Sequence, residues 1–125
     1  MGVGNATVLV CDDDPLMRKL LGQLLADMDC DVVGEAANGD QCIKLYARIK
    51  PDVVLLDINM PGKNGVAALR EIRKINAVAK VIMLTAMDDV VIAESCLHNG
   101  ALGYVRKGGD ADSLSQELQG FVERL

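Results

Sequence analysis

Long apolar runs and metal-type cysteine pairs are missing from this chain of 125 residues. No apolar stretch approaches the roughly 20 residues that a helix needs to cross a bilayer, and the N-terminus lacks the charged-then-apolar layout of a secretion signal. The four cysteines contain no C-x-x-C pair, and the single histidine, His98, cannot complete a soft-metal set. We therefore expect a reduced, cytoplasmic protein that does not associate with membranes.

Basic residues are outnumbered, with 13 Lys and Arg against 18 Asp and Glu, a formal net charge of -5 and a pI near 4.7. This balance argues against a generic attraction to nucleic acid or anionic lipid, so we expect no direct binding of nucleic acid. Half of the residues are apolar, which suits one compact domain but not two. We predict a single domain over residues 1–125, with proteins or small molecules as partners.

Short β-branched apolar runs alternate with amphipathic stretches along the whole chain. Predicted strands cover residues 7–11, 31–36, 52–57, 80–85 and 102–107, and predicted helices cover residues 15–28, 39–50, 64–75, 88–99 and 110–125. Strict alternation of this kind predicts a doubly wound α/β sheet. The stretch 88–99 is the least periodic of the helices, so we expect part of its apolar surface to stay exposed.

Acidic residues stand where two predicted strands end. Asp12 and Asp13 follow the first strand, and Asp57 closes the third. If these strands are parallel neighbours, the three carboxylates meet at one sheet edge and repel one another unless a cation lies among them. Magnesium prefers oxygen ligands, so short Asp side chains suit it. The sequence predicts a magnesium-assisted phosphoryl site.

Asp57 is the predicted nucleophile of that site. A carboxylate can attack phosphorus and form an acyl phosphate, with a metal and a lysine stabilising charge on the transferring oxygens. The loop after Asp57 offers backbone carbonyls to a metal, while Thr85 and Lys107 end the fourth and fifth strands. Thus four strand ends supply complementary groups.

Together these segments resemble the receiver domain of two-component response regulators. The matching motifs are Asp12-Asp13, residues 55–65 (LLDINMPGKNG), Leu84-Thr85-Ala86 and Tyr104-Val105-Arg106-Lys107. The resemblance covers nearly the whole chain. It implies a flavodoxin-like, three-layer α/β/α fold with five helices and a five-stranded parallel sheet in the order 2-1-3-4-5.

The resemblance also implies roles for single residues. Asp57 would accept a phosphoryl group from a histidine kinase or phosphotransfer protein, with Mg²⁺ held by Asp13, Asp57, the backbone carbonyl of Asn59 and, directly or through water, Asp12. Thr85 and Lys107 would bind the phosphoryl oxygens. Asn59 and Met87 stand where family members tune dephosphorylation. Such a protein catalyses only its own phosphorylation and dephosphorylation, and is not an enzyme in the ordinary sense.

A switch would follow from the same resemblance. Phosphorylation would draw Thr85 inward and vacate space for Tyr104. The face made by residues 88–99, the strand at Tyr104 and the last helix would then bind a downstream effector, an output domain or an identical domain as a homodimer. One departure concerns the bond after Lys107, where the family usually has a cis Lys-Pro. Here Gly108 follows, and we predict a trans bond or a strained cis bond that glycine tolerates.

Simpler interpretations compete with these assignments. Asp14 is expected only to cap the first helix, Tyr104 is at least as well explained as a half-buried strand residue, and Cys11 and Cys42 are expected in the core. A small metal-dependent phosphohydrolase with an aspartyl intermediate is the alternative function. A haloacid-dehalogenase-like enzyme, however, has Asp-x-Asp at one strand end, whereas Asp57 is followed by Ile58-Asn59. A binding-only pseudo-receiver is a third, weaker alternative.

Overall fold

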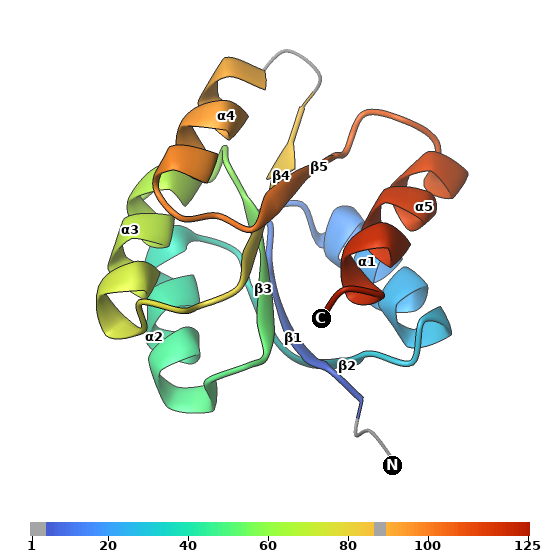
Figure 1. Cartoon of the computed structure of the whole chain (residues 1–125), viewed down its shortest axis with the longest axis horizontal. Helices are drawn as coiled ribbons and strands as arrows, with labels where there is room; N and C mark the ends of the chain where they lie inside the picture. The colour runs from blue at the N-terminus through green and yellow to red at the C-terminus, as the bar shows by residue number, and fades with distance from the viewer. Residues whose placement is uncertain (1–4, 87–89) are drawn as a thin grey trace.

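Strands and helices alternate from one end of the chain to the other in the computed structural model, which describes residues 5–86 and 90–125 (Figure 1). The strands are β1 (Thr7–Cys11), β2 (Asp31–Ala36), β3 (Val53–Asp57), β4 (Val81–Thr85) and β5 (Gly103–Arg106). The helices are α1 (Pro15–Asp27), α2 (Gly39–Ile49), α3 (Gly65–Ile75), α4 (Val90–His98) and α5 (Ala111–Val122). Every helix in the described part of the chain is too short or too polar to span a lipid bilayer.

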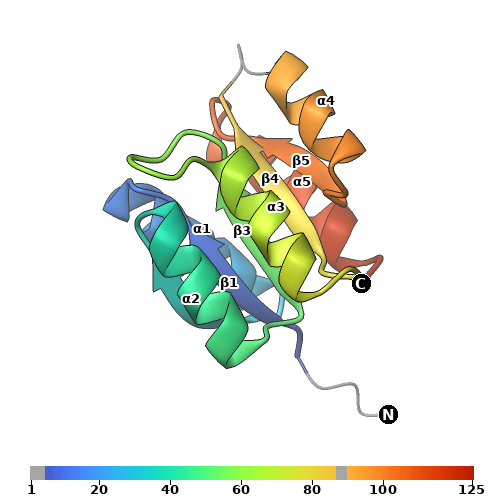
Figure 2. The ribbon, with the colours of Figure 1, turned by 90° about the vertical axis from the view of Figure 1, so that its left-hand side faces the viewer.

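The five strands form one parallel sheet in the order β2-β1-β3-β4-β5. Helices α1 and α5 cover one face of the sheet, and α2, α3 and α4 cover the other (Figures 1 and 2). The predicted doubly wound, three-layer fold and its strand order are confirmed. The predicted strands match the observed ones to within one residue at each end.

Capping side chains explain where the helices begin. Asp14 accepts a hydrogen bond from the Leu16 N–H, with Pro15 at the first helical position. Asn64 caps α3 through the Ala67 N–H, and Asp110 caps α5 through the Ser113 N–H. The Asp14 cap agrees with the sequence prediction, and Asn64 and Asp110 are residue types favoured at helix starts. Asn38 caps α2 in the same way, which the prediction did not include.

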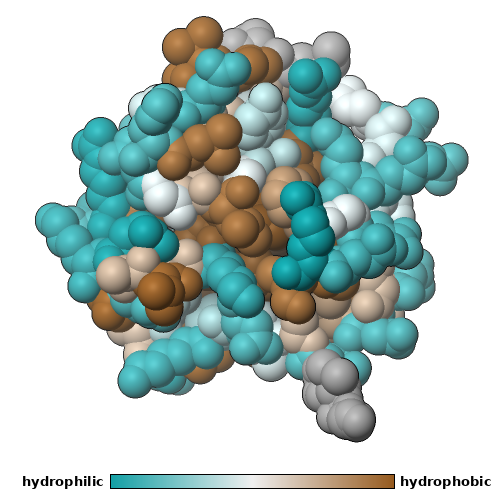
Figure 3. All heavy atoms as spheres, in the orientation of Figure 1, coloured by the Kyte–Doolittle hydropathy of each residue, from teal (hydrophilic) through white to brown (hydrophobic). Residues whose placement is uncertain are grey.

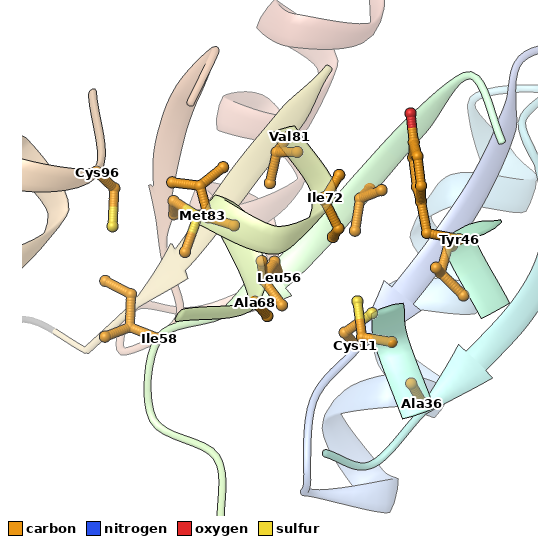
Figure 4. Close-up of a cluster of buried hydrophobic side chains, with 14 of the residues drawn as sticks. Cys11, Ala36, Tyr46, Leu56, Ile58, Ala68, Ile72, Val81, Met83 and Cys96 are labelled. Atoms are coloured by element: carbon orange, nitrogen blue, oxygen red, sulfur yellow. The ribbon is translucent and has the colours of Figure 1, made fainter. Parts of the chain in front are cut away.

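Two apolar layers hold the helices against the sheet, and β3 and β4 are buried along their whole length. The layer beneath α2, α3 and α4 is drawn in Figure 4, where Cys11, Leu56 and Met83 from the sheet lie near Ala68 and Ile72 from α3. The opposite layer joins α1 and α5 to the other face of the same strands. Cys11 and Cys42 are both fully buried, as predicted.

Apolar surface does remain exposed along α4, as its weak periodicity predicted. Val91 is 81% exposed, and Ile92 and Leu97 are about half as exposed. Hydrophobic atoms gather over α4 and across the middle of the face that Figure 3 presents. The predicted start of this helix at Asp88 lies outside the described residues. The described peptide bonds include no cis bond, so the bond after Lys107 is trans, the first of the two alternatives that the sequence left open.

Candidate functional site

The carboxyl ends of four strands meet at one edge of the sheet. Asp12 follows β1, Asp57 is the last residue of β3, Thr85 is the last of β4, and Lys107 follows β5. The chain reverses its winding direction between β1 and β3, and open α/β sheets bind ligands at such a point. The predicted convergence at this edge is therefore present.

In the described part of the chain, the polar or charged side chains classed as buried lie at this edge. Among the residues that the structure describes, Asp12, Asp57 and Thr85 are the polar or charged side chains classed as buried, with exposures of 0%, 2% and 0%. Burying a carboxylate is unfavourable unless it is paired or coordinates a cation. The fold therefore gathers energetically unfavourable buried carboxylates at one edge of the sheet, which is typical of a functional site.

Three carboxylates form the acidic cluster of Asp12, Asp13 and Asp57. One ligand oxygen from each lies within 4.8 Å of the others. Asp12 and Asp57 are buried, whereas Asp13 is exposed at the mouth of the site. This combination gives an all-oxygen donor set with one open side.

Lys107 bridges the two buried carboxylates. Its Nζ atom lies 3.1 Å from Asp12 Oδ2 and 3.0 Å from Asp57 Oδ2. Burial lowers the pKa of Lys107, but the close ion pair with Asp57 and the charge of Asp12 outweigh it, so the net shift of that pKa is upward. Lys107 is thus a firmly protonated cation facing two acidic groups.

Asp57 has an unusual carboxyl group. Burial, followed by the charge of Asp12, raises its pKa to about 6, against the opposing effects of Lys107 and the Asn59 N–H. Oδ1 accepts a hydrogen bond from that N–H at 3.3 Å. Oδ2 is buried and, despite the nearby ammonium, accepts no hydrogen bond of good geometry within the described part of the chain. One oxygen is thus held while the other is left for a metal or an electrophile.

The residues present fit a hard divalent cation. Carboxylate oxygens are the ligands that Mg²⁺ prefers, and its preference for keeping several waters suits a cluster with one open side. The buried, unsatisfied Oδ2 of Asp57 is the kind of atom that a cation would stabilise. The acidic cluster could therefore hold a metal ion.

The remaining predicted site residues lie at different positions relative to the acidic cluster. Thr85 lies on the strand next to Asp57, and its hydroxyl donates to the Ala86 carbonyl at 2.9 Å. The backbone carbonyl of Thr85 accepts the Lys107 N–H at 2.8 Å, which couples the ends of β4 and β5. Asn59 is exposed beside Asp57. Met87 lies outside the described residues.

Tyr104 lies on β5, half-buried against the core layer beneath α2, α3 and α4. It pairs in register with Met83, two residues before Thr85 on the neighbouring strand. This position agrees with the simpler interpretation of a half-buried strand tyrosine. It also leaves the side chain on the same side of the sheet as α4.

Two glycines that the sequence analysis did not single out shape the loop after Asp57. A Cβ atom on Gly65 would lie 2.2 Å from the Asp57 carbonyl oxygen, and one on Gly39 would lie 2.2 Å from the Lys63 carbonyl oxygen. The starts of α3 and α2 therefore press directly on the backbone of this loop. Both glycines begin helices, but only the three-dimensional packing reveals the close approach.

Comparisons with known proteins agree with this geometry. The family model of the response regulator receiver domain matches residues 8–119. The chemotaxis protein CheY of Listeria monocytogenes is 37% identical over 112 residues, which cover 90% of this chain and 94% of that protein. The response regulator GacA of Pseudomonas aeruginosa is 36% identical over 113 residues, which cover 90% of this chain. The match spans only 53% of GacA, about half of its length.

A solved structure gives the same result for the fold. A chain of the CheX–CheY–BeF3–Mg²⁺ complex from Borrelia burgdorferi matches with a TM-score of 0.85 and 28% sequence identity, over 93% of this chain and 88% of that chain. The strand order and the match over residues 8–119 point to one family. This chain belongs to the response regulator receiver domains of two-component signalling systems.

Proposed function

We propose that this receiver domain is a phosphoacceptor switch in which Asp57 takes a phosphoryl group from a histidine kinase or phosphotransfer protein. One observation carries the proposal: a buried carboxylate oxygen, Asp57 Oδ2, lacks a well-formed hydrogen bond and lies 3.0 Å from the Lys107 ammonium. That oxygen is the nucleophile. The family match over residues 8–119 supports assigning all of residues 1–125 to this one domain.

The reaction forms a bond between Asp57 Oδ2 and phosphorus while the bond from phosphorus to the donor nitrogen breaks. The donor histidine leaves as a neutral imidazole, because the nitrogen that loses phosphorus takes up a proton. Lys107 stays close to the accepting oxygen and stabilises negative charge on the transferring group. Nucleophilic attack needs the ionised carboxylate, and at neutral pH a pKa of about 6 leaves most of Asp57 ionised.

Asp12, Asp13, Asp57 and the backbone carbonyl of Asn59 are the proposed ligands of Mg²⁺. The ion, when bound, would offset the carboxylate charge and polarise the phosphoryl oxygens. Together with Lys107 it would neutralise the formal charge of the three aspartates. The complex from Borrelia burgdorferi contains Mg²⁺ and BeF3, which supports the same metal here.

Thr85 and Tyr104 are the proposed switch residues. After transfer, the Thr85 hydroxyl would leave the Ala86 carbonyl and donate to a phosphoryl oxygen, and Tyr104 would move into the space beside it. The exposed apolar residues of α4 lie on the same side of the sheet as Tyr104. Because β5 is the edge strand of the sheet, α4 and α5 flank it on its two sides. The proposed output face is therefore α4, β5 and α5, which would bind an effector, an output domain or a second copy of the chain.

A cytoplasmic location is proposed from the expected kinase partner and from the state of the cysteines. All four cysteines are buried and unpaired, in keeping with a reducing, cytoplasmic environment. A phosphohydrolase of the aspartyl-intermediate type is disfavoured, because Asn59 stands where a second aspartate would be needed after Asp57. We therefore propose transfer to the domain itself, without turnover on a separate substrate.

Intact-protein mass spectrometry after incubation with acetyl phosphate and Mg²⁺ tests the proposal. A phosphoacceptor gains one phosphoryl group per chain, and EDTA prevents the gain. Many turnovers of acetyl phosphate per minute without accumulation of the labelled chain would favour the hydrolase. The absence of both labelling and turnover would favour a binding-only domain.

A further inference from the structure

Arg18 makes an unexpected contact with the acidic cluster. It lies on the first turn of α1, and its side chain is 19% exposed. Nη1 donates to the backbone carbonyl oxygen of Asp12 at 2.6 Å, and Nε donates to Glu35 Oε1 at 3.0 Å. One guanidinium therefore joins α1 to the end of β1 and to β2.

The carbonyl of Asp12 needs such a donor. Asp12 lies one residue beyond β1, where its N–H still donates to the Ala36 carbonyl at 3.0 Å. A partly buried carbonyl without a donor is unfavourable. Arg18 supplies that donor from the helix side, so both halves of the Asp12 peptide backbone are fixed.

The side chain of Asp12 is fixed as well. Oδ1 accepts the Asp14 N–H at 2.9 Å, and Oδ2 accepts a hydrogen bond from Lys107 at 3.1 Å. Asp12 is therefore held at every polar atom, and in the described part of the chain Arg18 makes the only side-chain hydrogen bond that reaches it from α1. Loss of that contact would free the carbonyl and allow the backbone to rotate.

The two hydrogen bonds of Arg18 use the geometry of its side chain. A guanidinium presents several N–H groups in a rigid plane, so Nη1 and Nε can serve two acceptors at once. A lysine carries the same charge but has no such fixed fork. Glu35 neutralises part of the positive charge and orients the plane toward Asp12.

We propose that Arg18, oriented by Glu35, is a positioning residue that holds Asp12 in place for Mg²⁺ binding. This inference rests on the metal site of the proposed function. It assigns Arg18 no contact with phosphate or donor. Its effect passes entirely through the backbone carbonyl of Asp12.

Because Arg18 is positively charged, the direction in which its replacement changes Mg²⁺ affinity tests the inference. A cation this close to the acidic cluster repels Mg²⁺, so electrostatics alone predicts that its removal tightens binding. Positioning predicts the reverse. R18K keeps the charge and loses the fork, so only the positioning account predicts weaker binding for that variant.

Isothermal titration calorimetry of Mg²⁺ into the metal-free chain measures the effect directly. We expect the Mg²⁺ Kd to rise about tenfold in R18K and in R18M, the lower end of the range for groups that orient metal ligands. K19M is the matched control, since Lys19 is an exposed neighbour on α1 without the contact to Asp12. Its Kd should stay within about twofold of the wild-type value or fall slightly.

A second readout separates positioning from a general loss of stability. At saturating Mg²⁺, the rate of labelling by acetyl phosphate in R18K should return to within about threefold of wild type, because the metal itself then holds the ligands. Urea unfolding in EDTA shows whether each variant is folded. If R18M does not fold, the test rests on R18K alone. If the wild-type chain is labelled but the Mg²⁺ Kd of R18K lies within twofold of the wild-type value, this inference alone is overturned. A wild-type chain without Mg²⁺ binding or labelling would overturn the proposed function as well.

Discussion

The two ends of the sheet present opposite kinds of surface. At the amino end, a cavity of about 540 Å³ opens among residues that include Asp52, Tyr46 and Lys80. Its polar groups pair locally: Asp52 Oδ2 accepts the Thr7 N–H at 2.8 Å, and the Tyr46 hydroxyl accepts a hydrogen bond from Asn76 at 3.1 Å. At the carboxyl end, two buried carboxylates share one ammonium.

The difference shows that a cavity alone is a poor guide to function in this fold. The amino end is hollowed, but its aspartate is exposed and satisfied by neighbours. The carboxyl end keeps Asp12 and Asp57 buried and leaves Asp57 Oδ2 without a well-formed hydrogen bond. Charge that is buried and under-satisfied marks the carboxyl end as the candidate functional site.

Loss of labelling is the largest effect that separates the two ends. D57N should abolish the gain of a phosphoryl group from acetyl phosphate and Mg²⁺, because the amide is no nucleophile. D52N at the amino end should be labelled at the wild-type rate. Intact-mass spectrometry measures both, with circular dichroism to confirm folding. Equal labelling of the two variants would remove the distinction between the ends.

The lysines at the two ends should differ in their effect on stability. K107M leaves Asp12 and Asp57 without their shared cation, so we expect the metal-free chain to lose about 3 kcal/mol of unfolding free energy at pH 7. K80M removes an exposed charge at the amino end and should change stability by less than about 0.5 kcal/mol. Urea titrations in EDTA provide the comparison. A loss in K107M no larger than in K80M would contradict the bridging role.

Much of this arrangement can be predicted from the sequence, because strand ends and parallel order fix where Asp12, Asp57 and Thr85 must lie. The caps at Asp14, Asn64 and Asp110 are similarly local. What could not be predicted depends on packing between distant segments. The Arg18 contact needs the exact rotation of α1 against β1, and no local pattern marks it.

The glycine contacts escaped prediction for the same physical reason. Gly65 at the start of α3 is an ordinary helix-start residue by sequence, and its lack of a Cβ matters only because the Asp57 carbonyl lies against it. The register of a strand limits where a side chain can be. It does not reveal how closely a helix start approaches the strand end.

Substitution of that glycine should distinguish the site from the rest of the fold. G65A forces a Cβ against the Asp57 carbonyl, so we expect a loss of about 2 kcal/mol of stability and slower labelling. G22A on α1 meets nothing within 4 Å and should gain about 0.5 kcal/mol from the better helix propensity of alanine. Thermal or urea unfolding of both variants measures the contrast. A neutral G65A would show that the strand end can move freely.

A pH dependence is expected from the buried carboxyl group of Asp57 at the carboxyl end. Burial raises the pKa of Asp57 to about 6 in the folded chain, so the folded state binds a proton more tightly than the unfolded state. Stability from this group is therefore present below pH 4 and is lost as pH rises to about 6. In EDTA, D57N should gain about 2 kcal/mol relative to wild type across that interval.

D52N is the control for that titration, since Asp52 is exposed at the amino end. Urea unfolding at several pH values gives both curves. A pH-independent difference between D57N and wild type would show that burial does not perturb this carboxyl group.

Chemical trapping of the acyl phosphate tests the central claim most directly. Borohydride reduces an aspartyl phosphate to homoserine, and peptide mass spectrometry locates the reduced residue. After incubation with acetyl phosphate and Mg²⁺, we predict homoserine at position 57 and none when EDTA replaces the metal. Homoserine at another aspartate, or at position 57 regardless of Mg²⁺, would contradict a metal-assisted phosphoacceptor at the carboxyl end of the sheet.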